Sequence, residues 1–213
     1  MSQACPVCHH ENTVFFHDDS FRSFYQCPNC KLVFVPSAYH LSPQEEQARY
    51  EHHENDPEDK GYRRFLKRFF NPMNEKLTEN SEGLDFGAGP GPTLHLMFEK
   101  AGHTMDIYDL FFANNPTVFE KKYDFISATE VVEHLHLPMT DLNRLWHCLK
   151  PGGFLGLMTK MVQSKSAFEN WHYIRDKTHI SFFSKITFKW IARQWKAKCS
   201  FEGNGIVIFE KES

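Results

Sequence analysis

The chain has 213 residues, which is enough for one ordinary domain and a small additional unit. Its formal net charge of −3 excludes a strong overall field that would attract it to nucleic acid or to an anionic membrane. No apolar run approaches the roughly 20 residues that a transmembrane helix needs, and the N-terminus lacks the pattern of a signal peptide. We therefore expect a cytoplasmic protein whose six cysteines are thiols or metal ligands.

Two Cys-x-x-Cys pairs dominate the first 40 residues, and short β-rich runs between them predict a hairpin. The pairs are Cys5 with Cys8 and Cys27 with Cys30. Two intervening residues let both sulfurs face one ion, and this spacing is typical of a closed four-thiolate zinc site. We predict a structural Zn²⁺ in a zinc ribbon over residues 1–40. Redox-active thiols are the alternative, but a redox pair occurs singly at the start of a helix.

Residues 41–80 are polar and charged, with a helical pattern. Ser42-Pro43-Gln44-Glu45 is a capping box with proline at the first helical position. Between residues 60 and 70, basic side chains alternate with aromatic ones. Such a helix could contact phosphate, but packing over an active site explains it without a partner. We interpret residues 41–80 as a helical linker or lid, with a loop or hinge at residues 51–59.

A glycine-rich turn follows the first apolar run of the remaining chain. Leu84 leads into Asp85-Phe86-Gly87-Ala88-Gly89-Pro90-Gly91. Alternate glycines let the backbone turn sharply and bring its N–H groups against a ligand. Pro92 stands where a dinucleotide fingerprint would need glycine. A carboxylate ahead of the turn also suits a ligand with a positive amino group better than one with two phosphates, and S-adenosylmethionine is such a ligand.

From residue 81 onward, strand and helix patterns alternate, as in an α/β protein with a doubly wound parallel sheet. Apolar runs at residues 104–109 and 123–127 predict two more strands. Residues 149–153 predict the end of a helix, and residues 154–159 predict a strand. The final segment predicts an antiparallel hairpin that turns at Asn204 and Gly205.

Four of these segments, in this order, resemble the class I S-adenosylmethionine-dependent methyltransferases. They are the glycine turn, the strand ending in Asp109, residues 129–134 and residues 149–158. The form Glu130-x-x-Glu133-His134 is similar to the ubiquinone-type O-methyltransferases. The resemblance covers roughly residues 80–213. It implies a Rossmann-like methyltransferase domain over residues 81–213, with S-adenosylmethionine as cofactor.

The resemblance also implies a cofactor site at the ends of the predicted strands. Asp85 would bind the ammonium group, and Asp109 would accept hydrogen bonds from the two ribose hydroxyls. The alternatives are a loop-capping acid for Asp85 and a turn residue for Asp109. The residues expected to bind the cofactor are Asp85, Gly87, Ala88, Gly89, Pro90, Asp109, Leu110, Phe111, Thr129, Glu130 and Val131.

The sequence departs from the family pattern after Asp109. Too few residues precede the strand near Tyr123 for the usual helix, third strand and further helix. Residues 117–119 offer at most a short edge strand. This shortened third-strand region leaves adenine recognition open, because Phe111 and Phe112 would either cover the adenine face or cap the sheet edge.

Three histidines are candidates for catalysis. His134 follows the fourth-strand segment, where it would act as a general base or only order the loop. His172 and His179 belong to residues 168–179, a segment rich in side chains suited to recognition that resembles a run in relatives. This segment would either bind the methyl acceptor or serve as a hydrogen-bonded loop.

The sequence thus predicts methyl transfer to a small-molecule acceptor through oxygen, nitrogen or carbon. Methylation of an RNA base is one alternative, since some ribosomal-RNA methyltransferases carry a four-cysteine ribbon, but the near-neutral charge argues against a nucleic-acid partner. A zinc-ribbon binding module on a degenerate fold is another. The sequence specifies neither the acceptor nor the oligomeric state.

Overall fold

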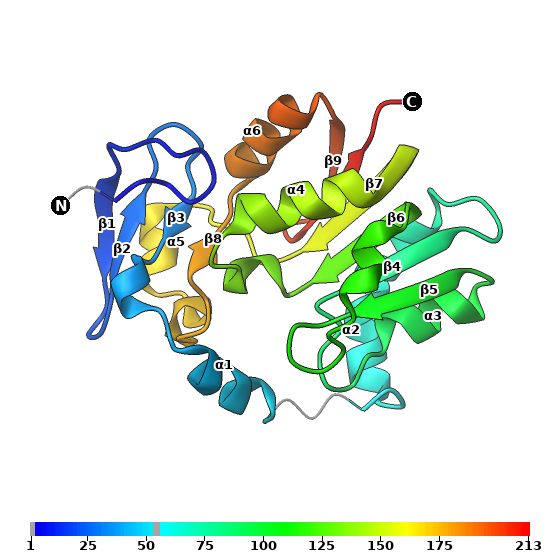
Figure 1. Ribbon diagram of the computed structural model, residues 1–213. Coiled ribbons are helices and arrows are strands. Elements are labelled where there is room, and N and C mark those ends of the chain that lie inside the picture. Colours follow the sequence, from blue (N-terminus) through cyan, green and yellow to red (C-terminus); the bar gives the residue numbers. More distant parts are fainter. Residues whose placement is uncertain (1–2, 53–55) are drawn as a thin grey trace.

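The computed structural model describes residues 3–52 and 56–213. Figure 1 shows a small β-rich N-terminal part beside a larger part that is built around a twisted sheet. The loop expected at residues 51–59 lies partly outside the described residues. Among the helices of the described residues, none is both long and apolar enough to cross a membrane.

The N-terminal part is a four-stranded sheet in the order β1-β2-β3-β8. Strands β1 (Val14–Asp18) and β2 (Ser23–Gln26) form the predicted hairpin, and β3 (Val33–Phe34) follows. The fourth strand, β8 (Ser181–Phe182), comes from the far end of the chain and pairs antiparallel with β3. The ribbon and the C-terminal half therefore share one sheet.

Two helices lead from the ribbon to the central sheet. Helix α1 (Pro43–Tyr50) begins with the predicted capping box, in which the Ser42 hydroxyl accepts a hydrogen bond from the Glu45 N–H. Helix α2 (Lys60–Asn74) begins at Asp59, whose side chain accepts hydrogen bonds from two backbone N–H groups. Its apolar face is buried against the sheet, as the packing interpretation of this helix expects. The buried side chains are Leu66, Phe69 and Met73.

The central sheet has six strands in the order β5-β4-β6-β7-β10-β9. The parallel strands are β4 (Glu82–Phe86), β5 (Thr104–Tyr108), β6 (Tyr123–Thr129) and β7 (Leu149–Met158). Strands β9 (Lys198–Glu202) and β10 (Ile206–Glu210) add the antiparallel hairpin. The predicted Rossmann-like α/β fold is confirmed.

The expected edge strand at residues 117–119 was wrong. These residues lie in a short 3₁₀ helix, η2 (Pro116–Glu120), where Asn115 caps the backbone N–H of Thr117. Proline at the first helical position favours this turn over a strand. Residues 109–122 are all described and contain no strand, so β5 is the edge of the sheet.

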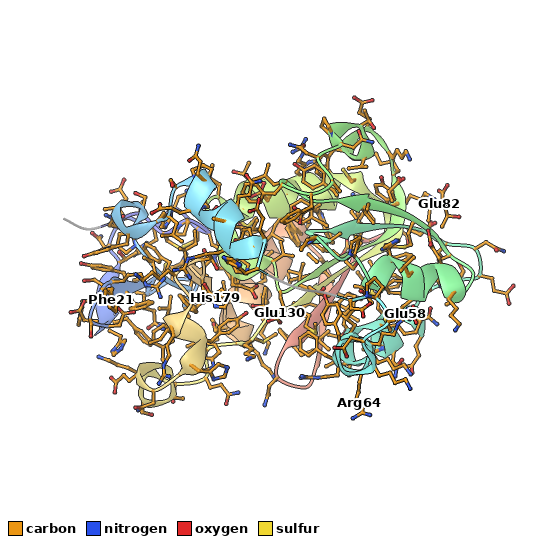
Figure 2. The ribbon with its side chains drawn as sticks, turned by 90° about the horizontal axis from the view of Figure 1, so that it is seen from below. Phe21, Glu58, Arg64, Glu82, Glu130 and His179 are labelled. Atoms are coloured by element: carbon orange, nitrogen blue, oxygen red, sulfur yellow. The ribbon has the colours of Figure 1, made fainter. Side chains whose placement is uncertain are left out.

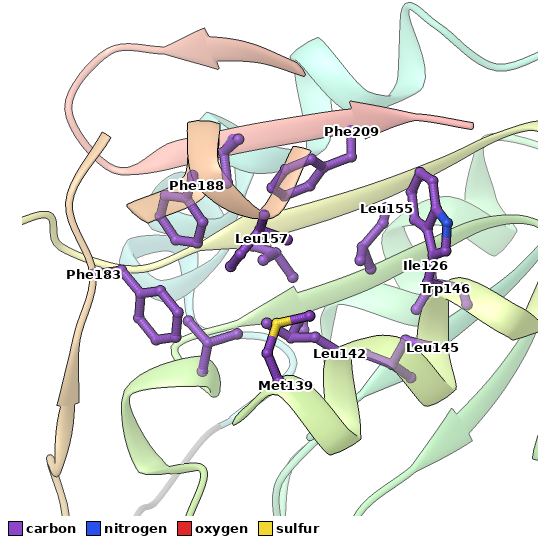
Figure 3. Packing of buried hydrophobic residues seen from close by; sticks show 14 of the residues in the cluster. Ile126, Met139, Leu142, Leu145, Trp146, Leu155, Leu157, Phe183, Phe188 and Phe209 are labelled. Atoms are coloured by element: carbon purple, nitrogen blue, oxygen red, sulfur yellow. The ribbon is translucent and has the colours of Figure 1, made fainter. Parts of the chain in front are cut away.

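Helices cover both faces of the central sheet (Figure 1). On one face, α2 and α3 (Leu94–Lys100) pack against β6 through Phe125. On the other face, α4 (Pro138–Cys148) and α6 (Lys185–Trp195) pack in one buried cluster with Ile126 and Leu157, and Figure 3 shows Ile126 near Leu155. Neighbouring strand residues point to opposite faces, so a parallel sheet covered on both sides reads as continuous apolar runs.

The parallel strands all end at the same edge of the sheet. The turns after Phe86, Tyr108, Thr129 and Met158 therefore meet there. Because the chain leaves β4 toward β5 on one side and reaches β6 on the other, this edge is the switch point at which open α/β sheets bind ligands. Residues 165–179 cross near it as α5 (Lys165–Glu169) and the 3₁₀ helix η4 (His172–Arg175).

Candidate active site

A cavity of about 710 Å³ lies at the switch point. The turns after β4, β5 and β6 form one side of it, and α1 and α2 contribute Tyr50, Tyr62 and Phe65. Every residue that the sequence predicted for the cofactor lines this cavity. They are Asp85, Gly87, Ala88, Gly89, Pro90, Asp109, Leu110, Phe111, Thr129, Glu130 and Val131.

The turn after β4 requires glycine at position 87. Gly87 has φ of 75°, and a Cβ placed on it would lie 2.3 Å from Cγ2 of Val131. Its N–H donates a hydrogen bond of 2.7 Å to the Tyr108 carbonyl oxygen. The missing side chain therefore lets the turn approach the Tyr108 carbonyl at the end of β5 and the Val131 side chain after β6.

Asp109 organises the next turn. One carboxylate oxygen accepts a 2.9 Å hydrogen bond from the Gly89 N–H, and the other accepts bonds from Phe111 and Phe112 at 2.9 and 3.1 Å. These are the contacts that the turn interpretation expects, and the same residue also lines the cavity. An ionised carboxylate has lone pairs for further acceptance, so the two roles are compatible.

Asp85 is a buried acid at the end of β4, with 3% of its surface exposed. The Ser127 hydroxyl donates a 2.8 Å hydrogen bond to it. Burial raises the pKa of Asp85 to about 7, and the Ser127 bond opposes this shift. A cation that enters the cavity would restore the ionised form, which suits this acid to a ligand ammonium group.

His134 and His179 both line the cavity, with ring centroids 4.7 Å apart. His134 Nδ1 lies 3.2 Å from the Thr178 carbonyl oxygen, and His179 Nδ1 lies 2.8 Å from that of Tyr173. Burial, assisted by His134, lowers the pKa of His179 to about 4, so that ring is neutral at pH 7. Figure 2 shows His179 and Glu130 near the centre of the molecule.

His172 is placed differently from the other two candidates. It is exposed and lines no part of this cavity. Its Nε2 lies 2.9 Å from the Lys160 ammonium nitrogen. The structure therefore brings two of the three predicted catalytic histidines together and leaves the third outside.

A buried acid pair lies next to the histidines. The Tyr173 hydroxyl donates to one oxygen of the fully buried Glu133, whose other oxygen has no hydrogen-bond partner. Burial raises the pKa of Glu133 to about 7, and burial together with Glu133 raises that of Glu130 to about 8. Glu133, His134 and His179 each present a ligand atom within 4.8 Å of the others, so they could hold a metal ion.

Sequence reasoning missed the part of the cavity that α1 supplies. Glu46 of this helix lies 2.7 Å from Nε2 of His136, which raises the pKa of that histidine. Tyr50 of the same helix also lines the cavity. Apart from the general expectation of a lid, no local signal marks these residues, because the cavity forms only when α1 folds back over the sheet.

The four paired cysteines form a second site, in the ribbon. Their sulfur atoms all lie within 4.8 Å of one another, with Cys5 and Cys30 at 3.5 Å and Cys8 and Cys27 at 3.3 Å. Both pairs have the same local structure, since the carbonyl oxygens of Cys5 and Cys27 each accept a bond from the N–H four residues later. Those later residues, His9 and Lys31, both have positive φ. Two equal knuckles facing each other fit a tetrahedral thiolate site.

The fold and the cavity define an α/β enzyme whose ligands bind at the switch point of a doubly wound sheet. The family model described as a methyltransferase domain matches residues 50–195. The chain therefore belongs to this methyltransferase family and is a methyltransferase. No curated protein matches the sequence.

Two solved structures from Burkholderia thailandensis are similar to the chain. One is 1,6-didemethyltoxoflavin-N1-methyltransferase with bound 1,6-didemethyltoxoflavin and S-adenosylhomocysteine, at 14% identity and a TM-score of 0.52, covering 92% of this chain and 98% of that one. The other is an O-methyltransferase family protein, at 14% identity and a TM-score of 0.51, covering 83% of this chain and 64% of that one. At these identities the likeness concerns the fold alone.

Proposed function

We propose that the protein transfers a methyl group from S-adenosylmethionine to a small-molecule acceptor in the 710 Å³ cavity. The observation that carries this proposal is that all the residues predicted for the cofactor line one cavity, at the switch point of a methyltransferase fold. The S-adenosylhomocysteine bound to the similar 1,6-didemethyltoxoflavin-N1-methyltransferase supports the choice of cofactor. The enclosing lid of α1 and α2 supports an acceptor of small size.

The residues around the glycine turn fit this cofactor. The glycine turn lines the cavity without large side chains, which suits close approach by a carboxylate or sugar. The buried Asp85 would hold the ammonium group, Asp109 the ribose hydroxyls, and Phe111 would cover the adenine. When bound, S-adenosylmethionine supplies a methyl group that its positive sulfur already activates. The chain then has to orient the acceptor and exclude water, and orientation alone can lower a barrier by roughly 7–11 kcal/mol.

His134 is the proposed general base when the acceptor atom carries a proton. With the proton on Nδ1, next to the Thr178 carbonyl oxygen, Nε2 is the basic nitrogen of the ring. His179 is the weaker base, because its pKa is lowered to about 4. His179 would instead help to position the acceptor. His172, which is exposed, is not assigned a part in proton transfer.

A second candidate role for this cluster is to bind a divalent cation beside the acceptor. The unpartnered oxygen of Glu133 favours it, as do the Nδ1–carbonyl contacts of His134 and His179, which are typical of metal-binding histidines. Titration of zinc-loaded protein with Mn²⁺, followed by electron paramagnetic resonance, tests this role. Saturable binding that Glu133→Gln abolishes would support the cation, and unbound Mn²⁺ throughout would leave His134 as a base.

The four cysteines are proposed to hold a structural Zn²⁺. Four thiolates fill a tetrahedral shell and leave no position for water, so this ion would stabilise the ribbon and take no part in methyl transfer. We predict three parts of the chain: a ribbon over residues 1–40, a lid over residues 41–80 and a methyltransferase domain over residues 81–213. The cytoplasmic location likewise stays a prediction.

Calorimetric titration with S-adenosylmethionine tests the proposed function. We expect wild-type protein to bind the cofactor with micromolar affinity, and Asp109→Ala and Gly89→Val to bind it at least tenfold more weakly. Glu82→Gln is the matched control, because Glu82 lies on β4 but its carboxylate only pairs with Lys150 at the exposed end of the strand. Absence of binding heat and of thermal stabilisation in the wild type would refute the proposal and favour a degenerate fold.

A further inference from the structure

A second, smaller cavity of about 240 Å³ lies beside the first. Phe65 and Glu130 line both cavities, so the two are neighbours across these side chains. The smaller one is formed by side chains from α2, the segment after β7, residue 171 and the turn between β9 and β10. None of its further lining residues was predicted for the cofactor.

Two cations that form no ion pair with a described residue line this cavity. Arg68 comes from α2 and Lys160 from the segment after β7. Among the described residues, no carboxylate lies within 4.0 Å of either positive group. The Arg68 guanidinium carbon lies 5.8 Å from the Phe65 ring centroid, and Lys160 approaches His172 and the Tyr173 ring. Arg68 is exposed and Lys160 is half-buried, and both line one hollow.

The acid that faces the two cations does not cancel them. Glu130 is the carboxylate of this cavity, and burial together with Glu133 raises its pKa to about 8. Because two cations and one carboxylate line this cavity, it keeps a net positive charge whether or not Glu130 is ionised. Trp171 and Phe65 add aromatic surface, and the amides of Gln163 and Asn204 add hydrogen-bonding groups.

We propose that the methyl acceptor is a small anionic molecule whose carboxylate or phosphate group binds in this second cavity, between Arg68 and Lys160. Its remaining part would pass Glu130 and present the nucleophilic atom in the main cavity. Two separate cations suit an anion with several oxygens, because each can make a charge-assisted hydrogen bond. This inference rests on the proposed function and names the class of its acceptor.

Matched probes test the inference. Zinc-loaded full-length protein saturated with S-adenosylhomocysteine is titrated with phenylacetate, phenyl phosphate and neutral phenylacetamide, and dissociation constants are measured by ligand-observed NMR. We expect the anions to bind at least tenfold more tightly than the amide, and Arg68→Gln and Lys160→Gln each to remove about tenfold of that affinity. Arg64→Gln is the control, since Arg64 is exposed like Arg68 on the same helix but does not line this cavity and lies away from Glu130 in Figure 2.

Three outcomes would overturn the inference. The first is equal affinity for acid and amide. The second is a loss of S-adenosylhomocysteine affinity in Arg68→Gln with probe binding unchanged, which would assign the cations to the cofactor. The third is binding of a short single-stranded RNA that Arg64→Gln and Arg68→Gln weaken equally, which would indicate a surface for nucleic acid. If S-adenosylhomocysteine fails to bind wild type, the proposed function fails, and the probe titrations without it still decide whether the anion site exists.

Discussion

At the scale of single residues, the active site depends on a position that has no side chain. Gly87 combines φ of 75° with close packing against Val131, whose Cγ2 would lie only 2.3 Å from an added Cβ. We expect Gly87→Ala to weaken cofactor binding at least tenfold and to lower the free energy of unfolding by about 1–3 kcal/mol. Calorimetry and thermal unfolding measure the two effects.

Gly102→Ala provides the control for this prediction. Gly102 has a positive φ of 95°, but a Cβ placed there meets nothing within 4 Å. It should therefore lower stability through backbone strain and leave cofactor affinity unchanged. Replacing Val131 with alanine in the Gly87→Ala protein should recover part of the lost affinity. No recovery would contradict the steric explanation.

We expect Asp85 to lower the stability of the unliganded protein and to strengthen cofactor binding. Its folded-state pKa of about 7 lies above the usual value of 3.8, so folding disfavours the ionised form. The resulting loss of stability begins above pH 4, grows as pH rises and levels off above pH 7. We expect the stability advantage of Asp85→Asn over wild type to grow by about 2–3 kcal/mol between pH 5 and pH 8 without cofactor.

The same substitution should weaken cofactor binding, because the neutral amide cannot pair with an ammonium group. Denaturant unfolding at several pH values and calorimetry with S-adenosylmethionine measure the two changes. A stability difference that does not vary with pH would show that Asp85 is ionised without ligand and would contradict the predicted role of burial.

At the scale of elements, a single arginine fastens the ribbon to the loop that carries His179. Arg22 is buried, with 4% of its surface exposed, and lies directly before β2. Its guanidinium donates hydrogen bonds to four backbone carbonyl oxygens of residues 174–179. The sequence predicted that this loop either binds the acceptor or is a hydrogen-bonded loop. The four bonds from Arg22, here called the clamp, show that it is a hydrogen-bonded loop and leave acceptor binding as a proposal.

We expect Arg22→Met to loosen residues 174–179 while the cofactor end of the cavity stays intact. Four carbonyl oxygens, two in buried and two in part-buried hydrogen bonds, would lose their donor, which costs on the order of 2–4 kcal/mol. Amide hydrogen exchange should rise in this loop, while affinity for S-adenosylmethionine changes less than twofold. Arg193→Met, on the exposed side of α6, is the control. Unchanged exchange in the loop would contradict the clamp.

At the scale of the whole molecule, the ribbon is continuous with the methyltransferase core. Cys5, Cys27 and Phe34 belong to the same buried cluster as Leu142 and Phe183. Strand β3 pairs with β8, and the Val35 N–H donates to the Ile180 carbonyl oxygen at 2.9 Å. We therefore expect disorder in the ribbon to disturb the side of the cavity that is proposed to bind the acceptor, near His179.

Removal of the proposed zinc should lower the stability of the entire protein. We expect chelation at neutral pH, or Cys27→Ser, to reduce the melting temperature by more than about 10 °C in one cooperative transition, since loss of a structural zinc removes folding energy directly. Differential scanning calorimetry and metal analysis by mass spectrometry measure this effect, with Cys199→Ser as the control thiol. Two transitions, the larger one unchanged, would show that the ribbon folds separately.

Local patterns in the sequence were sufficient for much of the fold and for the cofactor end of the site. The glycine turn, the cysteine pairs and the Ser42–Glu45 cap each act within a few residues, and each is present as expected. The edge strand expected at residues 117–119 does not form. Asn115 and Pro116 start a 3₁₀ helix there, and the apolar run is too short to favour a strand instead. His172 could not be separated from His179 in advance, since both lie in one polar loop and only burial distinguishes them.

By itself, the sequence determined which turns line the cavity and which thiols face one another, because these features depend on spacing along the chain. Only the tertiary structure decided that β8 joins the ribbon, that Arg22 clamps the loop of residues 174–179, and that Arg68 and Lys160 meet beside Glu130. These partners lie far apart in sequence. No local pattern identifies such contacts, because they form only when the core folds and brings the side chains together.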